Sequence, residues 1–425
     1  MQNGIKMCIV GAGSSYSPEL IEGVLGYAHE ELPVTEIRLH DVDGERLAVM
    51  AALARRMIAH AGRAITVRDG DALAPLLDGV DFVVTQIRVG GMPARILDEK
   101  IPLRHGVIGQ ETTGPGGMFK ALRTIPPMLE IARLVERIAP HAFMLNYTNP
   151  SGIISEAVTR HTGARFIGLC SGLPGMQAQL SSVLQQTFGE TRSYCVGLNH
   201  LGFIHKILAG NREVTAEALD YLLQRPDAVS TGGFATPEII RALRALPIGY
   251  VNYYLNRRQT VEQAQARAQS RGEVIIDIER EVFAEARDEH LAVKPPALAR
   301  RGGGGYANVT FRFMQAITFN RADELVCTVP NQGAVEGIEA DAGVEIVCRV
   351  DRNGPHPLPV GEIPLAFRGL VQAVKAYETL TVEASVTQSR ATAIQALINN
   401  PLVGDLGLAE TLVDELLAAH GLRYT

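Results

Sequence analysis

The first part of this chain contains an apolar strand-like run, a glycine-rich turn and the start of a helix, in that order. Residues 7–10 are apolar and lead directly into the turn at residues 11–16. Gly11 and Gly13 carry no side chain that would block a pyrophosphate, and a helix N-terminus supplies amide donors for its charge. Tyr16 takes the place of the third glycine in the usual spacing. The predicted cofactor-binding residues of this turn are Gly11, Gly13, Ser14, Ser15 and Tyr16.

A second strand-like run, residues 35–40, ends at Asp41. An acid at the tip of the second strand can accept hydrogen bonds from both ribose hydroxyls of an adenosine and would repel a 2′-phosphate. We therefore expect NAD rather than NADP as the cofactor. The alternative is an ordinary strand-to-helix turn followed by a surface acid.

Length and charge restrict the class of protein. With 425 residues the chain is too long for one ordinary core, and we expect two domains, residues 1–190 and 191–425. The 40 basic and 46 acidic residues give a net charge of −6, and no long single-sign block indicates a nucleic acid or an anionic membrane as partner. A small-molecule partner is expected. No apolar stretch reaches bilayer length and no signal segment is evident, so we expect a cytoplasmic protein.

The order of predicted elements indicates an α/β fold. Strand-like runs at residues 65–67, 81–85, 142–145 and 165–169 alternate with amphipathic stretches, which predicts a Rossmann-type doubly wound parallel sheet. In such sheets ligands bind beyond the carboxyl ends of the strands. Polar and metal-binding side chains follow several of these runs and would meet at one edge.

The pattern changes from about residue 193 and predicts an α+β domain. We expect strands at residues 325–329 and 344–350, and long helices at 273–289 and 365–397. The four glycines at residues 302–305 read as a flexible or close-packed loop. The five cysteines are odd in number and far apart, which is typical of reduced thiols.

Cys170 and His200 both follow apolar runs and are candidates for a metal site. A thiolate and an imidazole can hold a divalent cation and leave coordination positions open for water or substrate. Taken alone, however, Cys170 can equally be a buried small apolar residue and His200 a loop histidine with its hydrogen bonds satisfied.

Several long motifs in fixed order resemble the family 4 glycoside hydrolases, which are NAD- and metal-dependent glycosidases. The motifs lie at residues 88–91, 95–103, 109–117, 146–152, 168–170, 197–200, 294–303, 329–333 and 374–376, so the resemblance covers nearly the whole chain. It implies a fold similar to that of lactate and malate dehydrogenases. It also implies the cofactors NAD and Mn²⁺, and assembly as a homodimer or homotetramer.

The resemblance implies hydrolysis by a redox route. Bound NAD oxidises the sugar at C3, a base removes the C2 proton, and the aglycone leaves by elimination. Water then adds and C3 is reduced again. A C2 proton beside a metal-bound carbonyl comes within reach of a side-chain base, whereas that of an ordinary sugar does not.

The resemblance also implies a role for individual residues. Cys170 and His200 correspond to the ligands of Mn²⁺, and Tyr250 corresponds to the catalytic base. Arg88 and Arg95 correspond to arginines that face the sugar or its 6-phosphate, where a guanidinium suits an anion. Asn149 corresponds to a substrate-contacting asparagine. Glu111 lies in a loop near the site, either as a brace for that loop or as a catalytic carboxylate.

One departure from the family pattern affects the substrate. Ser171 stands where relatives that cleave phosphorylated glucosides carry Asp or Asn, so the acid that protonates the leaving group is unassigned. Motifs of the second half resemble 6-phospho-β-glucosidases most, and a sugar of that kind, a phosphorylated β-glucoside, is the expected substrate. The alternatives are a glycosidase of unphosphorylated or uronic-acid sugars, an NAD-dependent dehydrogenase of the 2-hydroxyacid type, and a catalytically inactive NAD-binding protein.

Overall fold

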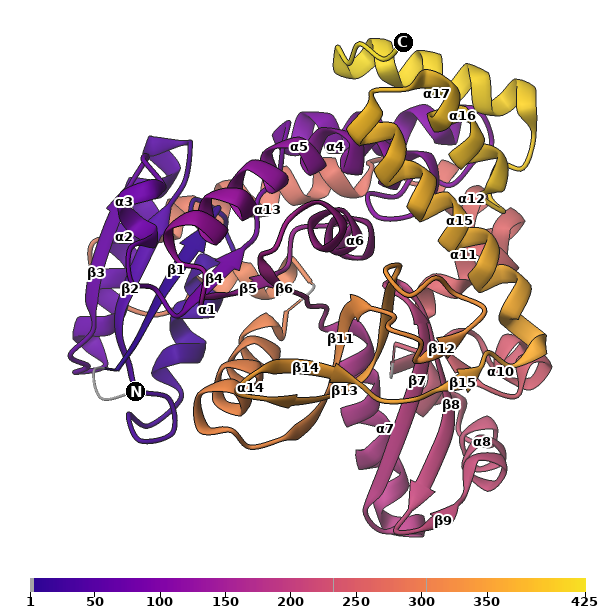
Figure 1. Ribbon diagram of the computed structural model, residues 1–425, viewed down its shortest axis with the longest axis horizontal. Coiled ribbons are helices and arrows are strands. Elements are labelled where there is room, and N and C mark those ends of the chain that lie inside the picture. Colours follow the sequence, from indigo (N-terminus) through magenta and orange to yellow (C-terminus); the bar gives the residue numbers. More distant parts are fainter. Residues whose placement is uncertain (1–3, 232, 303) are drawn as a thin grey trace.

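The computed structural model describes residues 4–231, 233–302 and 304–425. Within these residues a nine-stranded sheet has the order β14-β13-β11-β6-β5-β4-β1-β2-β3 and runs through the centre of the molecule (Figure 1). Its first-half strands are β1 (Ile5–Val10), β2 (Val34–His40), β3 (Thr66–Gly70), β4 (Phe82–Thr85), β5 (Phe143–Asn146) and β6 (Arg165–Gly168). These six pair in parallel in the order 3-2-1-4-5-6. The prediction of a Rossmann-type parallel sheet is confirmed.

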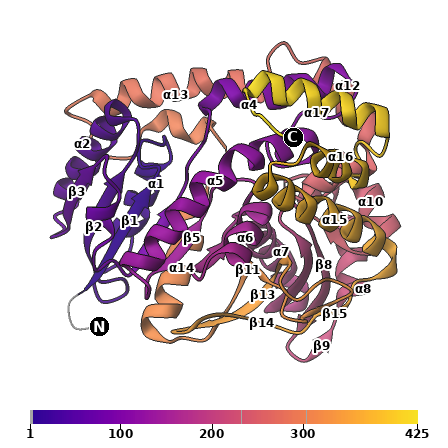
Figure 2. The ribbon, with the colours of Figure 1, turned by 45° about the horizontal axis from the view of Figure 1, so that its top comes forward.

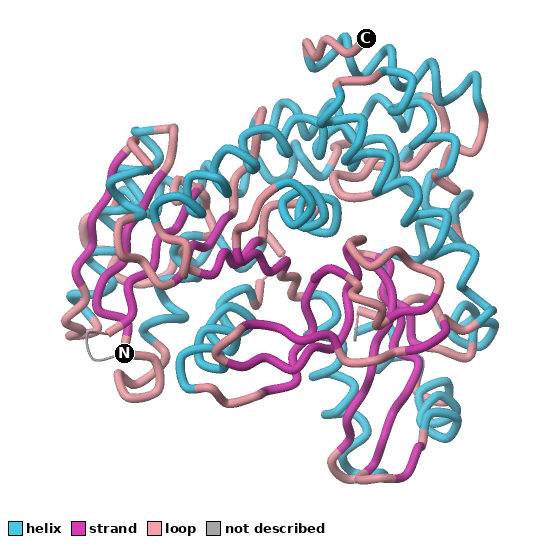
Figure 3. The backbone as a smooth tube through the Cα atoms, in the orientation of Figure 1, coloured by secondary structure: helices cyan, strands magenta, loops and turns pink. Residues whose placement is uncertain are grey.

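The central parallel strands are largely apolar because helices cover both faces of the sheet there. All four residues of β4 and of β5 are buried, as is most of β1. The helices of this half are α1 (Ser17–Leu25), α2 (Gly44–His60), α3 (Ala74–Leu77), α4 (Gly91–Arg104), α5 (Gly114–Ile138), α6 (Ser151–His161) and α7 (Gly172–Phe188). Strands and helices alternate along this part of the chain (Figure 3).

Strands from the second half extend the same sheet. The expected strands are present as β11 (Asp323–Pro330) and β13 (Gly343–Asp351), followed by β14 (Gly354–Pro357). β11 runs antiparallel to β6 and is joined to it at one register pair, Thr328 opposite Gly168. The sheet therefore changes from parallel to antiparallel at this point. The division into residues 1–190 and 191–425 stays a prediction.

A second sheet lies beside the first. It has the order β10-β8-β7, with β9 added to β8, and β7 packs against β13. Its strands are β7 (Thr191–Leu198), β8 (Leu201–Ala209), β9 (Arg212–Glu213) and β10 (Leu246–Pro247), while β12 (Val335–Glu336) and β15 (Gly361–Glu362) form a small pair. The helices are α8 (Thr215–Leu223), α9 (Pro226–Thr231), α10 (Pro237–Leu243), η1 (Gly249–Val251), α11 (Asn252–Leu255), α12 (Arg257–Gln265), α13 (Arg271–Arg287), η2 (Pro296–Arg300), α14 (Tyr306–Phe319), α15 (Leu365–Thr387), α16 (Arg390–Asn399) and α17 (Leu406–His420).

One expected helix is interrupted. The stretch 365–397 forms two helices, α15 and α16, and the prediction of one continuous helix is wrong. Gln388 ends α15 with a φ of 54° and Ser389 caps α16 by accepting a hydrogen bond from the Thr392 amide. The chain turns here without glycine or proline, which are the usual signals of a break. The other expected helix is confirmed as α13, which lies along α4 and α2 (Figure 2).

The remaining expectations concern the cysteines, the glycine loop and membranes. All five cysteines are free thiols, as expected. Gly302 and Gly304 lie in a loop, whereas Gly303 falls outside the described residues. Among the helices that the structure describes, none combines the length and apolarity required to cross a bilayer.

Candidate active site

A large cavity opens at the carboxyl edge of the parallel strands. Its volume is about 1450 Å³, more than the 300–1,000 Å³ of a typical small-ligand pocket. All but one of the predicted site residues line it: Gly11, Gly13, Ser14, Tyr16, Asp41, Arg88, Arg95, Glu111, Asn149, Cys170, His200 and Tyr250. The exception is Ser15, which is fully buried.

The glycine turn has the shape that a bound dinucleotide requires. Gly11 has a φ of 89°, and a Cβ there would lie 2.8 Å from the carbonyl oxygen of Gln86. A Cβ on Gly13 would lie 2.8 Å from Asp41 Oδ2. Asp41 Oδ2 accepts a hydrogen bond of 2.7 Å from the Gly13 amide, so the acid is held at the turn. The close fit of bare backbone and acid at the cavity wall matches the needs of NAD.

Ser15 supports this wall from behind. Its hydroxyl donates a 2.9 Å hydrogen bond to Glu279 of α13, which lines the cavity. Glu279 also forms ion pairs with Arg46 (3.3 Å) and Arg301 (3.1 Å). The turn is thereby connected to the second half of the chain.

Arg301 is a buried cation with free donors. Its guanidinium lies 4.0 Å above the ring of Tyr16, and burial lowers its pKa. The Nε and Nη1 atoms of Arg301 are buried and have no hydrogen-bond partner among the described residues. Unpaired N–H groups on two nitrogen atoms of a guanidinium are costly unless an acceptor is supplied. An anionic ligand in the cavity would supply one.

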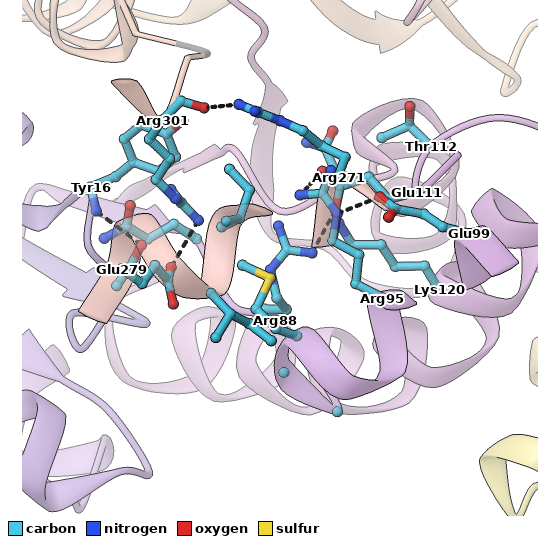
Figure 4. Close-up of a pocket in the computed structure, with 18 of the residues that line it drawn as sticks. Tyr16, Arg88, Arg95, Glu99, Glu111, Thr112, Lys120, Arg271, Glu279 and Arg301 are labelled. Atoms are coloured by element: carbon cyan, nitrogen blue, oxygen red, sulfur yellow. Dashed lines mark hydrogen bonds and ion pairs between the residues drawn. The ribbon is translucent and has the colours of Figure 1, made fainter. Parts of the chain in front are cut away.

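Glu111 is the centre of a cationic cluster (Figure 4). It forms ion pairs with Arg88, with Arg95 (3.0 Å) and with Lys120 (2.6 Å). Burial alone would raise the pKa of Glu111, but these three cations hold it well below its usual range. Burial, assisted by Arg88, lowers the pKa of Lys120 to about 7. Glu111 is thus an ionised brace that fixes both arginines, which favours the first of its two expected roles.

Cys170 lies just beyond the end of β6. Its sulfur accepts a 3.4 Å hydrogen bond from the Gly172 amide at the start of α7. Burial and the carboxylate of Glu345 raise the pKa of the thiol to about 12, whereas the Gly172 amide and the Asn199 side chain lower it. A thiol in such surroundings ionises only when a cation binds it.

His200 closes the two-residue turn between β7 and β8, with a φ of 65°. Its ring stacks on that of Tyr250, with centroids 4.1 Å apart and planes 19° from parallel. Burial lowers the pKa of His200 to about 4, so the imidazole is neutral near pH 7, the form that binds metals. Burial also raises the pKa of Tyr250.

The donor set of Cys170 and His200 fits a divalent cation with an incomplete protein shell. Among the described residues no cluster of three or more His, Cys, Asp and Glu side chains could hold an ion. One thiol and one neutral imidazole on the wall of the same cavity therefore leave coordination positions to water or substrate oxygen atoms. A thiolate is a soft ligand for Mn²⁺, so two such ligands give modest affinity.

Sequence reasoning missed several residues of this cavity. Thr112 and Lys120 stand in or just after the 109–117 motif, where each could have been examined beside Glu111. Glu279 gave no local signal because it lies on the buried face of an amphipathic helix. Only the packing of α13 over the turn brings it to the cavity wall.

The fold and the site are those of a glycosidase family that uses a dinucleotide. Residues 6–186 match the family 4 glycosyl hydrolases and residues 195–403 match their C-terminal domain. The chain therefore belongs to glycosyl hydrolase family 4.

Its relatives agree over the full length. The chain is 36% identical to the 6-phospho-beta-glucosidase of Escherichia coli K12, covering 99% of this chain and 96% of the relative. It superimposes on the 6-phospho-beta-glucosidase of Thermotoga maritima, solved with manganese, NAD⁺ and glucose-6-phosphate, with a TM-score of 0.88 and 29% identity over 99% of both chains. A lactate dehydrogenase from a deep-sea metagenome matches with a TM-score of 0.51 over 89% of this chain and 99% of its own. At 14% identity this last likeness shows the fold alone.

Proposed function

We propose that this protein is a 6-phospho-β-glucosidase that uses NAD and a divalent cation, Mn²⁺ by preference. The observation that carries the proposal is the shared cavity, which is lined by the glycine turn with Asp41, the pair Cys170 and His200, and Tyr250. A redox glycosidase needs the hydride acceptor, the cation and the base at adjacent carbons of one sugar. The relatives named above support the choice of reaction.

The residues present suit both groups. Gly11, Gly13 and Asp41 would hold the dinucleotide, while Cys170 and His200 would hold the cation. When bound, these groups supply hydride transfer at C3 and charge stabilisation beside it. All other steps depend on side chains of the chain itself.

Tyr250 acts as the base that removes the C2 proton. The ring lies against His200, so its hydroxyl is carried close to the proposed cation position. Burial raises the pKa of Tyr250 in the protein without the ion. A cation nearby has the opposite effect, because a positive charge favours the phenolate. The base is therefore activated only when the site is loaded.

Positive charge on the cavity wall supports a phosphorylated sugar. Arg88 and Arg95 are fixed by Glu111, and Arg95 also pairs with Glu99 (2.8 Å), so two carboxylates face two guanidinium groups and Lys120. Arg301 adds buried N–H donors without acceptors. Guanidinium groups bind phosphate oxygens in a forked geometry. Asn149 also lines the cavity and would contact the sugar.

Three finer points complete the proposal. The first half of the chain, residues 1–190, would bind NAD, and residues 191–425 would complete the substrate and metal site and form contacts between subunits. The protein would act as a homodimer or homotetramer in the cytoplasm. Ser171 lines the cavity but supplies no acid for the leaving group, so that role is not assigned to a residue.

The proposal is tested with p-nitrophenyl β-glucoside and its 6-phosphate, each in D₂O with NAD⁺, Mn²⁺ and a reductant. We expect nitrophenol release from the 6-phosphate, deuterium at C2 of the product and no net NADH. Omission of NAD⁺ or addition of a chelator should stop the reaction. Release without C2 deuterium would contradict the redox route.

The same assay separates the alternatives. If the unphosphorylated glucoside or a glucuronide is hydrolysed with a higher kcat/KM than the 6-phosphate, that sugar takes the place of the phosphorylated glucoside as the substrate. The α-anomer of the 6-phosphate tests the configuration at C1. Net accumulation of NADH would indicate a dehydrogenase. The likeness of this chain to a lactate dehydrogenase concerns the fold alone.

A further inference from the structure

Three residues of the cavity wall, Gln110, Thr112 and His200, form a short chain of hydrogen bonds. His200 Nδ1 lies 2.6 Å from Thr112 Oγ1. The Thr112 hydroxyl lies 2.6 Å from Gln110 Oε1, and the backbone amide of Thr112 donates to the same Gln110 oxygen. The chain runs from a residue of the β7–β8 turn to the 109–117 segment that precedes α5. No step of the proposed reaction uses Thr112 or Gln110.

The direction of each proton in this chain can be derived. A backbone N–H can only donate, so the Gln110 atom that faces Thr112 must be the amide oxygen, which only accepts. The single hydroxyl proton of Thr112 is then directed to that oxygen. The contact with His200 is left with the lone pairs of the hydroxyl, and Nδ1 must carry a proton to make it.

The other ring nitrogen is thereby defined. A neutral imidazole has one N–H, so a proton on Nδ1 leaves the lone pair on Nε2. No hydrogen bond joins Nε2 to any residue that the structure describes. Histidines that bind metals usually donate their second ring N–H to a protein acceptor, which fixes the tautomer and the ring orientation.

We propose that Thr112 is a positioning residue that, together with Gln110, holds His200 in the Nδ1–H tautomer and presents Nε2 as the metal-binding atom. The inference rests on the proposed function only in taking His200 as a ligand. Thr112 has the right placement because Glu111, its neighbour, is anchored by the arginines and Lys120. The anchored segment carries the Thr112 hydroxyl to the edge of the imidazole.

The stacking of Tyr250 makes this hydrogen bond important for the base as well. The Tyr250 ring covers one face of the imidazole at a centroid distance of 4.1 Å. A half-turn of the imidazole about its Cβ–Cγ bond would keep this stacking but exchange the positions of Nδ1 and Cδ2, and the Thr112 hydrogen bond selects the orientation with Nδ1 at Thr112. The ligand atom and the base are therefore oriented by one arrangement.

Metal affinity of the full-length protein with NAD⁺ bound gives the first test. We expect Thr112→Val to weaken Mn²⁺ binding about 10- to 100-fold, the usual effect of losing such a partner, as measured from free Mn²⁺ by EPR. Thr112→Ser keeps the hydroxyl and should stay close to the parent protein. Thr124→Val is the matched control, because the buried hydroxyl of Thr124 bonds only the Lys120 carbonyl. NAD⁺ affinity should be equal in all variants.

The tautomer itself gives the second test, on the metal-free protein labelled with ¹⁵N-histidine. We expect a protonated Nδ1 and an unprotonated Nε2 for His200, with its signals assigned by their absence in His200→Gln. The preference should be lost in Thr112→Val and kept in Thr112→Ser. A proton on Nε2 in the parent protein, or equal Mn²⁺ affinity of Thr112→Val, would overturn the inference. Neither readout needs substrate, so a failure of the proposed glycosidase activity is seen separately.

Discussion

At the scale of single residues, the site depends on groups whose charge is set by their surroundings. Glu111 is ionised because three cations surround it, while His200 is neutral because it is buried. Ser171 has only a hydroxyl to offer, which is not an acidic group. The family resemblance of the sequence indicated Cys170, His200 and Tyr250 as site residues, whereas the sequence could not predict the hydrogen bonds around them.

Tyr250→Phe should reduce kcat about 10²- to 10⁴-fold, the range for loss of a general base. Phenylalanine keeps the stacking on His200, so Mn²⁺ affinity should be unchanged. The measurement is turnover of the 6-phosphate substrate in D₂O. Tyr253→Phe removes a hydroxyl from the ring beside Tyr250 and should retain activity. Full turnover by Tyr250→Phe would remove it from the mechanism.

Glu345→Gln should change how stability depends on pH. Burial raises the pKa of Glu345 from its ordinary value of 4.5 to about 7. A raised carboxyl pKa gives a contribution that is complete below about pH 4.5 and lost as the pH rises through about 7. That loss amounts to about 3 kcal/mol, since each pKa unit corresponds to about 1.4 kcal/mol.

The test is urea unfolding of the metal-free protein at about pH 5 and about pH 8. Relative to the parent protein, Glu345→Gln should gain stability between these two values. Glu324→Gln, which alters an exposed carboxylate on the neighbouring strand β11, should show no such gain. A difference that does not change with pH would contradict the assignment.

At the scale of elements, the central strands β1, β4 and β5 were predictable because each one contains a run of apolar residues. The strands β11 and β13 were predictable as strands, but their place in the first sheet was not. Pairing of β11 with β6 joins residues far apart in sequence, so it cannot be predicted from a local sequence pattern. The break between α15 and α16 was missed for a different reason, since Gln388 gives no breaking signal.

Gln388→Gly should stabilise the protein by about 1 kcal/mol, because glycine adopts a positive φ without the strain of a side chain. The same substitution at Gln395, an exposed position inside α16, should destabilise by about 1 kcal/mol. Both values come from urea unfolding under one set of conditions. Effects of equal sign at the two positions would contradict the interpretation of this turn.

At the scale of the whole molecule, the cavity joins both halves of the chain. Glu279 and Arg301 come from the second half, yet they complete the wall around the glycine turn. Cys170 follows β6 of the first sheet, whereas His200 lies in the turn between β7 and β8 of the second sheet. A composition-based division of the chain could therefore not predict the site, which exists only when the sheets pack together.

Binding of Mn²⁺ should slow amide exchange at residues 165–172 and 196–204, measured by hydrogen exchange with mass spectrometry. The reason is that an ion bound by Cys170 and His200 resists separation of these two segments. The Cys170→Ser variant should lose the effect while keeping the response to NAD⁺. Equal exchange with and without Mn²⁺ in the parent protein would argue against shared coordination.

The change of strand direction between β6 and β11 has a consequence for how the enzyme responds to oxidation. Among the described residues one register pair, Thr328 opposite Gly168, joins β6 to β11, and two residues after Gly168 the chain reaches Cys170. A cation bound by Cys170 and His200 would act as a cross-link beside the β6–β11 boundary, which has the fewest register pairs in the main sheet. Oxidation of that one sulfur would remove the cross-link together with the chemistry. Loss of activity and loss of the β6–β11 contact should then proceed at the same rate. A thiol reductant should reverse both as long as the Cys170 sulfur is oxidised no further than a sulfenic acid or a disulfide.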